Sequence, residues 1–136
     1  EKAANGYLDL IKSNPEYEIN QLEKPGGPIG APIIYHLMQS CLHCFDKDSS
    51  SGSVLLERAA NLCNAYTNSE WVDRFFDPLE FQAERYFYSG QTEKAKTLFA
   101  LEKKFADAPT VQGLAQPYSA YASDYLQRIA RRESEK

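Results

Sequence analysis

The 136-residue sequence has little of three features that would assign it to a functional class: cysteine, long apolar runs and basic charge. Its three cysteines, Cys41, Cys44 and Cys63, form no even disulfide framework, which favours either a reducing compartment such as the cytoplasm or cysteines with no redox role. No run approaches about 18 apolar residues, so we expect no segment that inserts into a membrane. The net charge is −4, and neither half of the chain is basic enough to cover phosphates, which makes nucleic acid a poor partner.

Motifs that bind phosphate or activate a nucleophile are also missing. The glycine- and proline-rich segment 24–30 lacks the Lys-Ser/Thr pair and the spacing of phosphate-binding loops. The serines of 49–53 have no glycine-flanked nucleophile elbow. Asp77, Glu80 and Glu84 share one helix stripe, but a solvated helix face explains these carboxylates. We therefore expect a non-catalytic protein that holds no cofactor.

One group of residues resembles a metal or redox site, namely Cys41 and Cys44 with two histidines near them and Cys63 further along. At helical spacing Cys41 falls on the apolar face, where a small core residue is the simplest interpretation. His36 and His43 are seven residues apart and share the opposite face, so they do not converge with Cys41 on one ion. We expect no metal.

What the sequence does contain is helical periodicity along most of its length, with no segment that alternates like a strand. This predicts an all-α fold in a single domain over 1–136, interrupted by a long proline- and glycine-rich loop over 15–32. The chain starts at Glu1 without an initiator methionine, so we expect it to be a piece of a longer polypeptide. The expected helices number about six and cover approximately 2–13, 33–46, 53–67, 77–89, 92–106 and 117–132.

Local sequence signals set the expected helix ends. Ser53 is placed to cap its helix after an exposed turn over 46–53. Asp77 is expected to cap the next helix, with Pro78 in its first turn, and Gly90 is expected to end it in a left-handed conformation. The apolar cluster 71–76 is expected to form a separate short helical turn.

Residues 76–109 resemble one tetratricopeptide repeat, a helical hairpin of about 34 residues that stacks on its neighbours. The matching positions are Ala83, Tyr86, Gly90, Ala95, Phe99 and Phe105. The departures from the family pattern are Gln82, Thr92, Glu102 and Asp107. The resemblance implies antiparallel helix pairs stacked as an α-α superhelix, with the first helix of each pair lining a groove.

On the expected helix 77–89 a second apolar stripe joins carboxylates, which suggests a groove for a protein or peptide partner with basic residues. The candidate partner-binding residues are Glu80, Phe81, Glu84, Phe87 and Tyr88. Burial of this stripe against another helix is the other interpretation. The leading hypothesis is a protein interaction or scaffold domain. The alternative is a helical ligand-binding or accessory domain of a larger enzyme or membrane protein, with a small molecule held by the tyrosines of the last helix.

Overall fold

The computed structural model describes residues 31–64, 69–108 and 112–135, and these residues form five helices and no strand. The all-α prediction is confirmed for this part of the chain. The helix expected over 2–13 and nearly all of the loop expected over 15–32 lie outside the described residues. The helices are α3 (Ala31–Lys47), α4 (Ser49–Asn64), α5 (Ser69–Tyr88), α6 (Thr92–Ala106) and α7 (Gln112–Ser134).

Helices α3 and α4 are joined by a single residue, Asp48, whose side chain caps α4. Its Oδ1 accepts hydrogen bonds from the backbone N–H groups of Ser50 (3.1 Å) and Ser51 (3.3 Å), which have no partners within the helix. These bonds hold the pKa of Asp48 below its usual range. The expected cap at Ser53 and exposed turn over 46–53 are therefore wrong, because α4 already begins at Ser49.

Helix α5 begins earlier than its sequence signals suggested. Asp77 and Pro78 lie inside it, so the expected cap, the proline in the first turn and the separate helical turn over 71–76 are all wrong. The apolar side chains before Asp77 share one buried stripe with Leu79, and burial of this stripe outweighs the cost of a proline inside the helix. The buried residues of that stripe are Val72, Phe75, Phe76 and Leu79.

The turn between α5 and α6 forms as predicted. Gly90 adopts a positive φ of 85°, which glycine enters without steric cost. The N–H of Gln91 donates to the carbonyl of Tyr86 at 2.9 Å and closes the end of α5. Helix α6 then covers Thr92–Ala106, as predicted. Ala83 and Ala95 are fully buried where α5 packs on α6.

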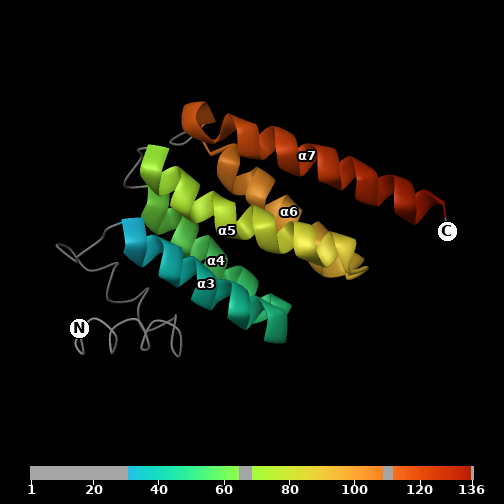
Figure 1. The fold of residues 1–136 in the computed structure, drawn as a ribbon, viewed down its shortest axis with the longest axis horizontal. Coiled ribbons are helices and arrows are strands. Elements are labelled where there is room, and N and C mark those ends of the chain that lie inside the picture. The colour runs from blue at the N-terminus through green and yellow to red at the C-terminus, as the bar shows by residue number, and fades with distance from the viewer. Residues whose placement is uncertain (1–30, 65–68, 109–111, 136) are drawn as a thin grey trace.

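Figure 1 shows α3, α5 and α7 running side by side, with α4 and α6 behind α5. Helix α3 packs against α4 and α5, and α6 packs against α5 and α7. Helix α7 begins before Pro117, which the sequence suggested as its start. Its Tyr125 stacks on Phe99 with ring centroids 4.7 Å apart, and Tyr118 stacks on Phe76 at 5.0 Å. No helix among the described residues is long and apolar enough to span a membrane.

The close approach of α4 to α3 at Gly52 yields a prediction. A Cβ atom at Gly52 would lie 2.3 Å from the Cα of Phe45, so Gly52→Ala must push the two helices apart. We expect a loss of about 1 to 3 kcal/mol in the free energy of unfolding, measured by urea denaturation.

Gly113→Ala is the matched control, because a Cβ at Gly113 meets nothing within 4 Å. Alanine is the better helix former, so this change should leave stability unchanged or raise it by less than about 1 kcal/mol. Equal effects of the two substitutions would contradict the close α3–α4 contact.

Candidate functional site

The five predicted partner-binding residues all lie on the second half of α5, but they differ in exposure. Phe81 and Tyr88 are each 65% exposed, so the competing expectation that the second stripe is buried does not hold for them. Glu80 and Glu84 are half-buried. Phe87 is only 3% exposed, and its expected exposure is wrong because it packs edge-on against Tyr125 of α7. Phe81 and Tyr88 therefore form the apolar part of the accessible stripe.

A row of tyrosines on α7 donates hydrogen bonds to carboxylates on α5, and we name this row of contacts the α5–α7 seam. The Tyr118 hydroxyl lies 2.8 Å from Asp73 Oδ1 and 2.6 Å from Asp77 Oδ1, and its single proton is shared between these two acceptors. Tyr121 donates to Glu84 at 2.6 Å. Partial burial and these bonds raise the pKa of both tyrosines, so they remain donors at neutral pH. Each of these carboxylates keeps an oxygen that the tyrosines do not occupy.

Tyr88 closes one end of the seam. Its hydroxyl lies 2.7 Å from the hydroxyl of Tyr125, and its ring meets the rings of Phe87 and Tyr125 edge-on. The side chain is thus held in place while most of its surface faces solvent. A fixed, exposed aromatic ring loses little conformational entropy when it contacts a partner, which suits an anchor residue.

Glu102 of α6 is fully buried behind the seam. When Glu102 and Glu80 are both ionised, each carboxylate is only an acceptor, and neither can donate to the other. The carboxyl oxygens of Glu102 then have no hydrogen-bond partner. A proton on Glu102 removes this conflict, since the protonated carboxyl donates to Glu80. Burial, followed by the neighbouring Glu80, Glu84 and Asp77, raises the pKa of Glu102 to about 10.

Sequence reasoning named Glu102 only as a departure from the repeat pattern, and it missed both the burial of Glu102 and the tyrosine pairings of the seam. A spacing signal existed for Glu102, because it lies four residues after Leu98 and three after Phe99, both in the core. Its charge argued against burial. The pairing of α7 tyrosines with α5 carboxylates needed the relative placement of two helices that are separated in sequence by α6.

The cysteine group behaves as core packing where the structure describes it. Cys41 is fully buried, as predicted, and burial raises the pKa of its thiol to about 12, so it is a poor nucleophile and metal ligand. Cys44 is half-buried and His43 is exposed. The side chain of Cys63 lies outside the described part. Among the described residues, no three His, Cys, Asp or Glu side chains are placed to hold a metal ion.

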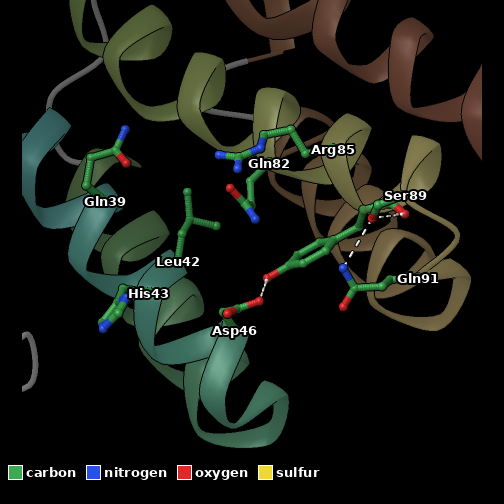
Figure 2. A pocket seen from close by; sticks show the side chains of 9 residues that line it. Gln39, Leu42, His43, Asp46, Gln82, Arg85, Ser89 and Gln91 are labelled. Carbon is green, nitrogen blue, oxygen red and sulfur yellow. Dashed lines mark hydrogen bonds between the residues drawn. The ribbon is translucent and has the colours of Figure 1, made fainter.

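A cavity of about 410 Å³ opens between α3 and α5, and nine residues line it (Figure 2). One end is formed by Asp46, which accepts a 2.6 Å hydrogen bond from Tyr86 and a 2.9 Å bond at its carbonyl from Lys94. These contacts hold the pKa of Asp46 below its usual range, chiefly through the Tyr86 hydroxyl. Burial and the same bond raise the pKa of Tyr86 to about 12. This cavity was not predicted from the sequence.

The pocket proposed for the alternative function is not formed by these cavities. Tyr118, Tyr121 and Tyr125 line neither the cavity of about 410 Å³ nor a second one of about 260 Å³ between α4 and α6. Tyr125 is 4% exposed and packs on Phe99. Neither of these two cavities therefore supports a small molecule held by these tyrosines.

Comparison with known proteins gave no match to the chain among family models, curated protein sequences or solved structures.

The buried carboxyl pair makes stability depend on pH. Between the ordinary carboxyl pKa of 4.5 and the folded value of about 10 for Glu102, the folded chain binds more protons than the unfolded chain. The free energy of unfolding therefore falls as pH rises, by up to about 1.4 kcal/mol per pH unit from this group.

Glu102→Gln keeps the shape of the side chain and removes its ionisable proton. It should therefore flatten the dependence of the free energy of unfolding on pH and stabilise the chain at the alkaline end. Urea denaturation from about pH 5 to about pH 8 measures this dependence. Parallel curves for the two proteins would contradict the protonated carboxyl.

Proposed function

We propose that this chain is a non-catalytic protein interaction domain that binds a partner segment along the exposed stripe of α5. The observation that carries the proposal is the pair Phe81 and Tyr88, two large rings each 65% exposed on one stripe of the central helix. Exposed aromatic residues gathered on one face are typical of surfaces that a partner covers.

The distribution of exposed apolar side chains supports this choice. The exposed rings belong to the three helices that lie side by side in Figure 1, namely α3, α5 and α7. Among the described residues of α4 and α6, the only large apolar side chain exposed to this degree is Val54. Among the residues whose burial the structure describes, the exposed aromatic residues are Tyr35, Phe81, Tyr88 and Tyr121.

Charge next to these rings indicates the chemistry of the partner. Among the residues that the structure describes, no lysine or arginine forms an ion pair with Asp73, Asp77 or Glu84. Like charges along one stripe repel each other, and a basic residue of the partner would relieve that repulsion. We therefore propose a partner segment that places lysine or arginine at the α5–α7 seam and apolar side chains on Phe81 and Tyr88.

The tetratricopeptide-like arrangement belongs to the same proposal. Two helical hairpins, α3 with α4 and α5 with α6, follow each other, and the first helices of both hairpins, α3 and α5, are in contact. This is the order of contacts expected for stacked hairpins that leave a surface along their first helices. We propose an α-α superhelical stack on this basis, with α7 covering α6.

Peptide selection tests the proposed surface. A random peptide library displayed on phage and selected on the immobilised chain should enrich sequences that combine lysine or arginine with apolar residues. Phe81→Ala should weaken the enriched peptide by at least about fivefold, because a truncated anchor typically costs 1 kcal/mol or more. Its melting temperature should not change, since the ring is exposed. Added salt should weaken binding, because charge at the rim acts through screened attraction.

Val54→Ala is the matched control, since Val54 is 59% exposed but lies on α4. It should leave peptide affinity within about twofold. Tyr88→Phe keeps the ring and removes the hydroxyl that meets Tyr125, whereas Tyr88→Ala removes both. Comparing the two substitutions separates the contact of the ring with the peptide from the positioning of the ring by Tyr125. Enriched peptides that bind Phe81→Ala and Val54→Ala equally well would contradict the proposed surface.

A further inference from the structure

We infer that the cavity between α3 and α5 is a binding site for an acidic side chain, aspartate or glutamate, from the partner segment, with Arg85 as its cationic anchor. This inference rests on the proposed function and adds a second contact point to it. The α5–α7 seam and this cavity lie on opposite sides of the exposed stripe of α5. A partner segment that lies across α5 thus meets carboxylates on one side and a guanidinium on the other.

The geometry places the polar groups toward one space. Figure 2 shows Gln82 extending from α5 toward α3 with the Arg85 guanidinium beside it, while Gln39 and Leu42 extend from α3 on the opposite wall. Leu42 is the one aliphatic side chain among the nine lining residues. A cavity with mostly polar walls favours a polar ligand, because an apolar ligand would leave the wall groups without hydrogen bonds.

The charge balance of the cavity identifies the ligand as an anion. Asp46, the one carboxylate in the wall, already has a cation and a donor, since Lys94 lies 3.5 Å from its Oδ1 and Tyr86 donates to the same atom. Arg85 forms no ion pair with any residue that the structure describes. The cavity therefore keeps one positive charge without an internal counterpart, and a guanidinium holds a carboxylate through two parallel hydrogen bonds.

The two glutamines favour a peptide-borne acid over a free anion. Gln39 and Gln82 stand on facing helices, and each amide offers both a donor and an acceptor. The Gln82 amide also faces the Tyr86 hydroxyl, which engages part of it. The remaining amide groups match the N–H and C=O groups of a peptide backbone, whereas a free carboxylate would satisfy only their donors.

The test uses blocked amino acids as probes and the full 136-residue chain. N-acetyl-glutamate N-methylamide is titrated into ¹⁵N-labelled protein, and amide chemical shifts are followed by NMR. We expect saturable shifts around Gln39, Gln82 and Arg85 with a millimolar dissociation constant, as a ligand of this size allows. The corresponding blocked glutamine has the same shape without the charge and should bind at least about tenfold more weakly.

Substitutions assign the effect to Arg85. Arg85→Gln should raise the dissociation constant of blocked glutamate at least about tenfold, and Arg85→Lys should restore part of the affinity because it keeps the charge and loses the paired hydrogen bonds. Arg131→Gln removes an exposed arginine from α7 and should leave the dissociation constant of blocked glutamate unchanged within about twofold. Phe81→Ala should also leave it unchanged, so a failure of the α5 surface and a failure of this cavity are distinguishable.

Three results would overturn the inference. The first is the absence of saturable shifts at the cavity, and the second is equal binding of the glutamate and glutamine probes. The third is inorganic phosphate binding more tightly than blocked glutamate, which would make the cavity a phosphate site and not a site for an acidic side chain.

Discussion

The structure depends on the burial of α5, the one helix that packs against all four others in the described part of the chain. Alanines at its contact with α6 allow the two backbones to approach, and aromatic rings on α6 and α7 fill the space beside them. Because α5 is covered on three sides, only one stripe of it reaches solvent. Phe81 and Tyr88 occupy that stripe, so the packing of the core decides which residues remain available to a partner.

The parts of the fold that were predictable from sequence are those set by local rules. The positive φ of Gly90 and the bounds of α6 depend on residues within one hairpin, and both were predicted correctly. The start of α5 was not predictable in this way. Asp77 and Pro78 have the pattern of a helix start, but burial of Phe75 and Phe76 contributes roughly 1.5 to 3 kcal/mol each, against about 3 kcal/mol for a proline inside a helix. Packing that involves several helices therefore overrides the local pattern.

The candidate site shows the same division. Phe81 and Tyr88 were identified on the helix stripe that the structure leaves exposed. Phe87 was wrongly included among the exposed residues. The residue pattern of α5 alone cannot reveal that Tyr125 of α7 packs against the Phe87 ring. The polar cavity between α3 and α5 depends on contacts between residues about 40 positions apart, such as Tyr86 with Asp46. No periodicity within a single helix carries that information.

The buried carboxyl of Glu102 connects the core to the proposed surface. A leucine at this position would bury more apolar area and need no proton, so the glutamate is a poor choice for stability alone. Its proton is shared with Glu80, whose half-buried carboxyl lies near Glu84 and Asp77 at the seam. A cation placed at the seam would favour the ionised form of both acids and lower the cost of charging them. Binding of the proposed basic partner would therefore be linked to the protonation of this pair, and each would change the free energy of the other by the same amount.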